Sequence, residues 1–400
     1  MNILAFLKSG LMLTASGLVY SLIQWLVFIY LSWQHTADEV SYYAYILAFI
    51  GPGIMLANFG VRSLITTSED KSVDVTLIFI RVCLLVVVSI GLISYFYTYN
   101  PDYIFIVVFL FLFKASDSFA DGVYGIFQKI EKYELIFLSR IIRSFMYLLV
   151  LVLGYTFDFT LNLLVMLLAF SSLLISLLFE VRYSVKYYKI FSEGFSCFSK
   201  MKKVIYSGIA LSATLYLNSM LINYPRISVE KYIGLEDLKI FVSIGYMFVF
   251  SDAIFQAINS ISLRRLSIID GKRGGLHFKF FSLNILLILF IFGFVALFGS
   301  TILSVLYKAD FDNYSYLIQV TTLAFLLNNL ASSIGCILTA MKKNVIQPFI
   351  TFGTFMFLLI LMAISEIEVL SDIAEVFLLA IICKLILVSA YYFSGLRAKG

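Results

Sequence analysis

The sequence predicts an all-α integral membrane protein in which twelve transmembrane helices form two six-helix bundles around a central cavity. Apolar residues occupy 62% of the 400 positions and charged residues only 13%, whereas soluble domains are close to half apolar and a quarter charged. Apolar runs recur along the whole chain, and about 20 such residues in a helix span a bilayer. Twelve runs leave too few residues for a separate soluble domain.

The first six helices are predicted from apolar runs bounded by charged or turn residues. They cover 10–33, 40–61, 75–97, 103–127, 135–155 and 161–181. The first run is too long for a signal-peptide core and lacks a small-residue cleavage site, so we expect it to remain as an anchor. In the second run, "IGPGI" puts Pro52 between two glycines. Because proline kinks a helix, Pro52 is a hinge candidate, and a static kink is the alternative.

The second six helices are predicted in the same way. They cover 204–224, 238–260, 278–298, 315–340, 345–364 and 374–394. The predicted domains are an N-terminal bundle at 1–181, a basic cytoplasmic connector at 182–203 and a C-terminal bundle at 204–400. The stretches "IFQKIEKYELIFLSR" and "CILTAMKKNVIQPFI" fill matching places in the two halves. Parallel repeats of this kind are typical of transporters.

Lys and Arg are distributed unequally between alternate loops. One side carries 23 of them, and the other carries only Arg226, Lys231, Lys239 and Lys308 together with thirteen acidic residues. Cytoplasmic loops are enriched in Lys and Arg, so both termini are predicted to be cytoplasmic. The net charge of +5 is thereby explained by attraction to the anionic headgroups of the lipid bilayer, and no nucleic acid partner is expected.

Several charged residues lie deep in the predicted helices of the first half. Lys114, Asp117 and Asp121 share one face of the fourth helix, because they are spaced i, i+3 and i+7. Either Lys114 and Asp117 neutralise each other and fix helix packing, or this face lines the cavity and binds substrate. The other deep cations are Arg81, Arg140 and Arg143. They either extend to cytoplasmic lipid headgroups or bind phosphate through their guanidinium groups.

Two charged residues lie deep in the second half. Asp252 is an ion-coupling candidate that would carry a proton or sodium, and a simply protonated or hydrogen-bonded carboxyl is the alternative. Lys384 is a further candidate for the cavity. No metal site and no cofactor are expected, since the four cysteines are scattered and the two histidines, His35 and His277, lie far apart.

Three stretches carry a family resemblance. They are "DGVYGIFQKIEKYE" between the fourth and fifth helices, "NYPRISVEKYIGLEDLKIFVSIGYMF" leading into the eighth, and "ILSVLYKADFDNYSYLI" before the tenth. With the twelve helices and the basic connector, they resemble the polysaccharide or O-antigen flippases of the multidrug/oligosaccharidyl-lipid/polysaccharide exporter (MOP) superfamily. Lys308 stands where that family commonly has a glycine.

The resemblance implies a protein of the bacterial inner membrane that is not an enzyme. Such a protein moves an undecaprenyl-pyrophosphate-linked glycan from the cytoplasmic to the periplasmic leaflet by alternating access. The glycan is then polymerised into O-antigen, as in lipopolysaccharide biosynthesis, or into a related surface polysaccharide. The implied partners are a polysaccharide polymerase and a chain-length regulator, and a proton or sodium gradient is the implied source of energy.

Three other classes of membrane protein fit parts of the sequence. A multidrug or ion antiporter of the same superfamily has twelve helices, but a cationic cargo favours an acidic cavity and the interior of the first half is basic. A membrane O-antigen polymerase needs a long outside loop, and the predicted outside loops are short. A multi-pass acyltransferase needs a base such as histidine within the membrane, and both histidines fall in predicted loops.

Overall fold

The computed structural model describes residues 3–68, 70–188, 198–268, 274–341 and 346–397. The regular structure in these ranges is helical, and twelve of the helices are long and apolar enough to cross a membrane. The predicted all-α fold with twelve transmembrane helices is therefore confirmed, and each predicted range overlaps one of these helices. Contacts divide the chain into two compact units, Met1–Ser219 (unit 1) and Met220–Gly400 (unit 2).

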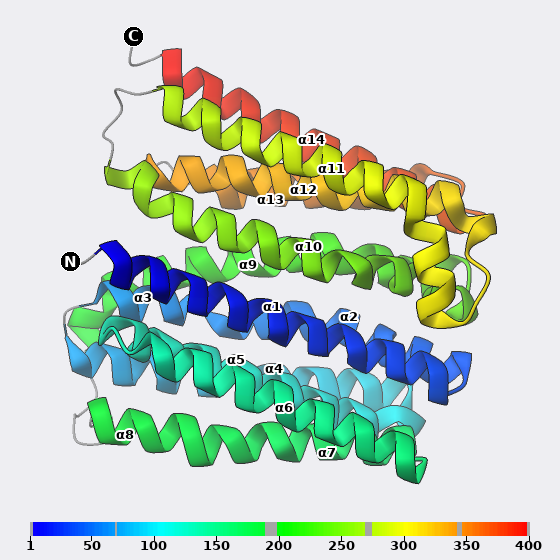
Figure 1. Cartoon of the computed structure of the whole chain (residues 1–400), viewed down its shortest axis with the longest axis horizontal. Helices are drawn as coiled ribbons and strands as arrows, with labels where there is room; N and C mark the ends of the chain where they lie inside the picture. Colours follow the sequence, from blue (N-terminus) through cyan, green and yellow to red (C-terminus); the bar gives the residue numbers. More distant parts are fainter. Residues whose placement is uncertain (1–2, 69, 189–197, 269–273, 342–345, 398–400) are drawn as a thin grey trace. The chain divides into compact units, whose positions relative to one another are not determined.

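Unit 1 contains the first six membrane-spanning helices (Figure 1, blue to green). Its elements are α1 (Ile3–Gln34), α2 (Ala37–Asn58), α3 (Val61–Thr67), α4 (Lys71–Tyr99), η1 (Pro101–Tyr103), α5 (Ile104–Lys129), α6 (Tyr133–Phe157), α7 (Leu161–Ile175), η2 (Ser176–Val181), α8 (Arg182–Tyr188) and the first part of α9 (Phe198–Tyr232). Helix α5 is central to the unit because it packs against α2, α3, α4, α6 and α7, whereas α1 packs mainly against α6. Polar groups on α5 are therefore within reach of several other helices.

The second membrane helix is interrupted at Phe59 and Gly60. The sequence predicts one helix over 40–61, but α2 ends at Asn58 and α3 begins after a turn in which Phe59 and Gly60 have φ of 50° and 61°. Positive φ favours glycine, and a Cβ on Gly60 would lie 2.7 Å from the Leu211 side chain of α9. Helix α2 is continuous through Pro52, so the break lies beyond the proline. The role of Pro52 as a hinge stays a prediction.

The sixth membrane helix is longer than predicted. It continues through the π-helical turn η2 into α8, and the membrane-spanning stretch ends at Tyr188. The Tyr188 hydroxyl donates a hydrogen bond to the fully buried carboxylate of Asp74, which also forms an ion pair with Lys129. This buried pair on α4 and α5 anchors the end of the helix, which a hydropathy pattern does not reveal.

The predicted connector at 182–203 is partly helical. Its first residues belong to α8 and its last belong to α9, and residues 189–197 lie outside the described part of the chain. The boundary between the units falls within α9. The first part of α9 packs against the break in the second membrane helix, where a Cβ on Gly208 would overlap the Phe59 ring.

Unit 2 contains the remaining membrane-spanning helices (Figure 1, green to red). Its elements are the rest of α9, α10 (Leu235–Ile268), α11 (Gly274–Tyr307), η4 (Asp312–Tyr314), α12 (Ser315–Ala340), α13 (Gln347–Ile364) and α14 (Leu370–Arg397). Helix α12 is central because it packs against α10, α11 and α14. In its membrane-spanning window 72% of the residues are buried, compared with 17% for α11.

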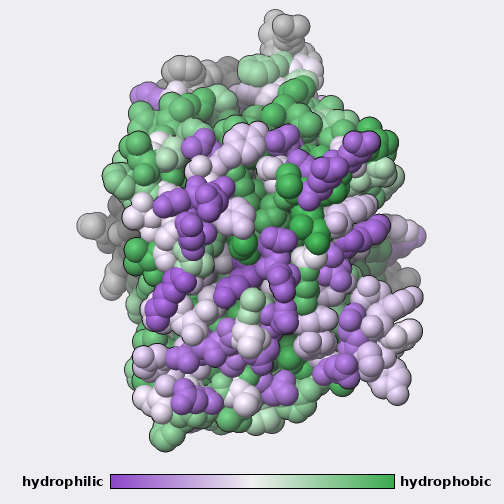
Figure 2. Space-filling view, turned by 90° about the vertical axis from the view of Figure 1, so that its right-hand side faces the viewer, coloured by the Kyte–Doolittle hydropathy of each residue, from purple (hydrophilic) through white to green (hydrophobic). Residues whose placement is uncertain are grey.

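The helix ends that lie on the right of Figure 1 carry many hydrophilic residues (Figure 2). In unit 2, the α9–α10, α11–α12 and α13–α14 turns lie at this end (Figure 1). Lys308 follows α11 with φ of 51°, a left-handed conformation in which glycine is favoured after a helix.

Candidate functional site

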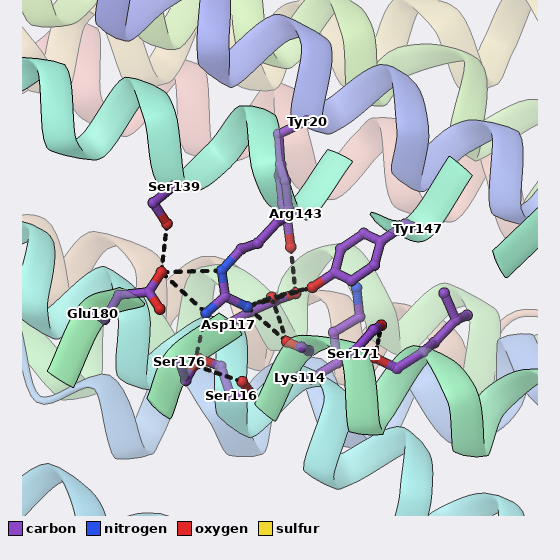
Figure 3. A network of polar contacts seen from close by, with 12 residues as sticks. Tyr20, Lys114, Ser116, Asp117, Ser139, Arg143, Tyr147, Ser171, Ser176 and Glu180 are labelled. Carbon is purple, nitrogen blue, oxygen red and sulfur yellow. Dashed lines mark hydrogen bonds and ion pairs between the residues drawn. The ribbon is translucent and has the colours of Figure 1, made fainter. Parts of the chain in front are cut away.

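The most extensive polar network of unit 1 surrounds Arg143 of α6, whose side chain is only 1% exposed. Its Nη1 lies 2.9 Å from Asp117 Oδ1 and its Nη2 lies 3.2 Å from Glu180 Oε1 (Figure 3). The guanidinium also donates hydrogen bonds of 2.7 Å to Ser172 and to Ser176. Two carboxylates thus share one guanidinium. We call these five side chains the Arg143 cluster.

The π-helical turn η2 supplies two members of this cluster, Ser176 and Glu180. Glu180 is fully buried and also accepts a hydrogen bond from Ser139. Its second oxygen, Oε2, has no hydrogen-bond partner among the described residues. Single π-helical turns are frequent at functional sites, where the extra residue changes the direction of side chains. Here the turn joins the end of α7 to α6 through bonds assisted by charge.

Lys114 does not form an ion pair with Asp117 in the described structure. Its Nζ instead donates a hydrogen bond of 2.6 Å to Gln24 Oε1 of α1. Besides Arg143, the donors to Asp117 are Tyr20, Tyr147 and Ser172. The i, i+3 spacing placed Lys114 and Asp117 on one face, but Asp117 is satisfied by other helices. The pair that neutralises charge therefore joins α5 to α6.

A second ion-pair cluster lies around Asp121, one turn further along α5. Arg62 Nη1 is 2.9 Å from Asp121 Oδ1, and Arg81 Nη2 is 3.5 Å from Oδ2. Arg81 also donates hydrogen bonds to Ser118 and Asn58. Because Arg81 is 1% exposed, it is held inside the unit and does not extend to lipid headgroups. We call these five side chains the Asp121 cluster.

A cavity of about 140 Å³ is lined by members of both clusters. The lining residues are Tyr20, Asp117, Ala120, Asp121, Tyr124, Arg140 and Arg143. Arg140 is partly buried and forms no ion pair with a described residue. Its Nη1 donates a hydrogen bond of 3.3 Å to the Leu13 carbonyl, and its guanidinium lies 5.5 Å from the centre of the Tyr124 ring. Arg140 is therefore a cavity cation whose charge no described carboxylate neutralises by contact.

The charges of this region do not cancel. The five cations are Arg62, Arg81, Lys114, Arg140 and Arg143, and the three carboxylates are Asp117, Asp121 and Glu180. The two clusters together with Lys114 and Arg140 therefore hold two more cations than carboxylates, whereas the charged residues that line the cavity itself, two arginines and two aspartates, are equal in number. An excess of cations in a medium of low dielectric constant attracts anions.

Unit 2 holds its buried charges differently. Asn329 donates a hydrogen bond of 2.7 Å to Asp252, which is partly buried on α10. Lys384 of α14 donates one of 2.8 Å to Asn328. The described residues of the whole chain contain no group of three or more His, Cys, Asp and Glu that could hold a metal ion. The two predicted residues of unit 2 both contact asparagines of α12.

The structure adds three charged residues that sequence reasoning missed. Arg62 was counted in a loop, but it belongs to α3, and Glu180 stood one residue from the predicted end of its helix. Arg226 was also counted in a loop, but it lies within α9, 5.6 Å from the Tyr246 ring. Glu180 was already inside the predicted range 161–181, and extending the predicted helices 40–61 and 204–224 by one turn would have included Arg62 and Arg226.

A family model for polysaccharide biosynthesis proteins matches residues 6–269, which is more than half of the chain. The chain belongs to this family. A curated relative, the capsular polysaccharide biosynthesis protein CapF of Staphylococcus aureus, is 24% identical over 254 residues. These residues are 63% of this chain and 63% of the relative, so the match spans slightly less than two thirds of the relative's length.

Solved structures of MOP superfamily transporters have a similar fold. An inward-facing multidrug resistance MATE family transporter has a TM-score of 0.69 at 12% identity, over 100% of this chain and 99% of that chain. The outward-facing conformation of a multidrug resistance MATE family transporter has a TM-score of 0.67 at 13% identity, over 98% of this chain and 96% of that chain. A MOP superfamily transporter from Pyrococcus furiosus has a TM-score of 0.67 at 12% identity, over 98% of this chain and 96% of that chain. For that transporter, the reverse polarity of the binding pocket suggests a different function.

These similarities confirm the resemblance that the sequence carried. This polysaccharide biosynthesis protein is a multi-pass membrane protein with the fold of the MOP superfamily transporters. At such low identity the solved structures show the fold alone. The cargo must therefore be inferred from the side chains of this chain.

Proposed function

We propose that this polysaccharide biosynthesis family member flips an undecaprenyl-pyrophosphate-linked oligosaccharide from the cytoplasmic to the periplasmic leaflet of the bacterial inner membrane. The cargo is the repeat unit of O-antigen or a related surface polysaccharide. The observation that carries the proposal is Arg140, a cation that lines the cavity of unit 1 and forms no ion pair with a described residue, next to two clusters in which other cations hold the carboxylates. A pyrophosphate headgroup carries about two negative charges that must leave water, and nearby cations offset this cost.

The arginines of the cavity have different roles in this proposal. Arg143 lines the cavity and is bound to carboxylates, and Arg81 holds the lining residue Asp121, whereas Arg140 lines the cavity and forms no ion pair with a described residue. We assign Arg140 to the first contact with the pyrophosphate, because a guanidinium binds phosphate oxygens through paired hydrogen bonds. Lys114 adds positive charge from α5. The carboxylates Asp117 and Asp121 weaken the attraction enough for release.

Transport also needs a direction and a source of energy. The excess of Lys and Arg in one set of loops and at the adjoining helix ends supports cytoplasmic termini. Asp252 is our candidate for proton or sodium coupling, since it is a carboxylate without an ion pair to a described residue. Arg226 of α9 and Lys384 of α14, which bonds to Asn328, are the candidate cations of unit 2 to balance its charge change. A polymerase and a chain-length regulator would act on the flipped product.

Deletion of the gene in its native host tests the proposal. We expect the long surface polysaccharide to disappear and the lipid-linked repeat unit to accumulate in the cytoplasmic leaflet, where an impermeant lectin cannot reach it in spheroplasts. An unpolymerised unit accumulating in the periplasmic leaflet would instead indicate a polymerase. Normal surface polysaccharide together with increased sensitivity to cationic drugs would indicate a multidrug antiporter.

A further inference from the structure

A separate pocket of about 420 Å³ lies in unit 2, where its three polar turns meet. Side chains from the α9–α10 turn, from η4 and α12, and from the start of α14 line it. Its polar lining residues are Asp237, Asn313, Tyr314, Tyr316, Glu368 and Ser371. Ligand sites typically have volumes of about 300–1,000 Å³. The pocket is therefore large enough for one or two sugar residues.

Tyr316 gives this pocket a fixed aromatic surface. Its side chain is 57% exposed, but its hydroxyl donates a hydrogen bond of 2.9 Å to Glu375 Oε1. The neighbouring Tyr314 lies with its ring centre 6.3 Å from that of Phe311. A tyrosine ring combines a large apolar face with little conformational freedom. Such a face suits the C–H side of a pyranose ring.

The polar side chains offer mostly hydrogen-bond acceptors. Asp237 and Glu368 present carboxylates, Asn313 can both donate and accept, and Ser371 carries a hydroxyl. Hydroxyl and amino groups of a sugar donate to carboxylates in strong hydrogen bonds. Neither Lys nor Arg occurs among the described residues that line the pocket. An added anion would therefore be repelled, and an amino group would be attracted.

The turns that form the pocket are held by their own hydrogen bonds. Asp372 accepts bonds of 2.9 Å from the backbone N–H groups of Glu368 and Val369. Asp310 accepts one of 3.0 Å from the Asp312 N–H in the turn before α12. A site that is formed before binding loses less conformational entropy when a ligand arrives.

From these observations we propose that the pocket binds a neutral or amino sugar of the cargo glycan and disfavours acidic sugars. The inference rests on the proposed function, which makes a glycan the cargo and puts these turns on the periplasmic side. It adds a second contact, in unit 2, to the pyrophosphate contact in unit 1. It also predicts the sugar chemistry of the cargo, which the charges around Arg140 do not.

The test is saturation-transfer NMR on the purified full-length protein in lipid nanodiscs, with methyl glycosides of a hexose, an amino-hexose and a hexuronic acid. We expect binding of the first two, and at least about fivefold weaker binding of the hexuronic acid because of charge repulsion. Tyr316→Ala should weaken binding of the hexose by about tenfold, since the ring face is lost. Tyr155→Ala is the matched control, because Tyr155 is a similarly exposed tyrosine on α6 of unit 1 (60%).

Equal binding by the wild type and Tyr316→Ala, or preferred binding of the hexuronic acid, would overturn the inference. If Tyr316→Ala does not fold, Asp237→Asn gives an independent test. It should strengthen hexuronic acid binding by about threefold or more and leave hexose binding nearly unchanged, because it removes one repelling charge. Absence of sugar binding in a protein that still restores surface polysaccharide to the deletion strain overturns the pocket alone. A deletion strain with normal polysaccharide overturns the proposed function, whatever the pocket binds.

Discussion

The two units stabilise buried charge in different ways. In unit 1, buried Arg81, Arg143 and Asp74 form ion pairs, whereas in unit 2 Asp252 and Lys384 are hydrogen-bonded to asparagines of α12. Removing one member of a buried ion pair leaves the opposite charge uncompensated. Removing a charged side chain whose partner is a neutral amide leaves no charge behind. The charge pattern of unit 1 should therefore resist change. The charge pattern of unit 2 should tolerate a change of charge, as a site that gains and loses an ion must.

Loss of Arg143 should have the largest effect on stability. Arg143→Met leaves Asp117 and Glu180 buried without their shared cation, at a cost of about 3–5 kcal/mol in the free energy of unfolding. Reversible SDS denaturation of the purified protein measures this change. Adding Asp117→Asn and Glu180→Gln to Arg143→Met should recover much of the loss. A single Arg143→Met variant as stable as the wild type would show that the Arg143 cluster does not hold α5, α6 and α7 together.

Matched carboxylate substitutions compare the units directly. Asp117→Asn removes an anion that accepts hydrogen bonds from Arg143 and two tyrosines, so it should cost about 2 kcal/mol. Asp252→Asn replaces the carboxylate that accepts the Asn329 hydrogen bond with an amide oxygen that also accepts it. It should therefore lower the free energy of unfolding by less than about 1 kcal/mol. Both are measured in the same SDS titration. Equal losses would contradict the difference between the units.

The break in the second membrane helix gives a smaller effect. Gly60→Ala places a Cβ at φ of 61° and 2.7 Å from Leu211, which should destabilise unit 1 by about 1–2 kcal/mol. Gly91→Ala, on α4, is the control, because a Cβ there meets nothing within 4 Å. Thermal unfolding of both variants in detergent separates the two outcomes. Similar melting temperatures would indicate that Gly60 is not required by its conformation.

The smallest expected effect is a gain in unit 2. Lys308 has φ of 51°, so Lys308→Gly should stabilise the end of α11 by up to about 1 kcal/mol. A small rise in melting temperature would support this reading. A fall would show that the contacts of the Lys308 side chain outweigh the conformational gain.

Hydropathy and the positions of charged residues were sufficient to predict the twelve helices, because each apolar run must satisfy its backbone groups internally. The break at Phe59 was not predictable in the same way, since phenylalanine carries no signal for positive φ. The π-helical turn was equally hidden, because nothing in "SLLFEV" distinguishes a π-helical turn from a continued α-helix. Both features depend on tertiary contacts.

The sequence predicted most residues of the candidate site but not which of them form ion pairs with each other. The sequence brought out Arg81, Asp117, Asp121, Arg140 and Arg143, because a charge within an apolar run stands out. One of the two alternatives for this helix face paired Lys114 with Asp117, whereas the ion-pair partner of Asp117 comes from another helix. Glu180 was missed because it stood near a predicted helix end. Contacts between helices depend on packing, and one sequence does not encode them in a pattern that can be read locally.

The central claim is that Arg140 binds a pyrophosphate. Native mass spectrometry of the purified protein with undecaprenyl pyrophosphate measures this contact directly, with Lys202→Ala as a control at an exposed cation on α9. We predict that Arg140→Ala lowers affinity by about tenfold or more, as expected for a hydrogen bond to a charged group, and that Arg140→Lys retains part of it. Affinity of Arg140→Ala equal to that of the wild type and of Lys202→Ala would contradict the account.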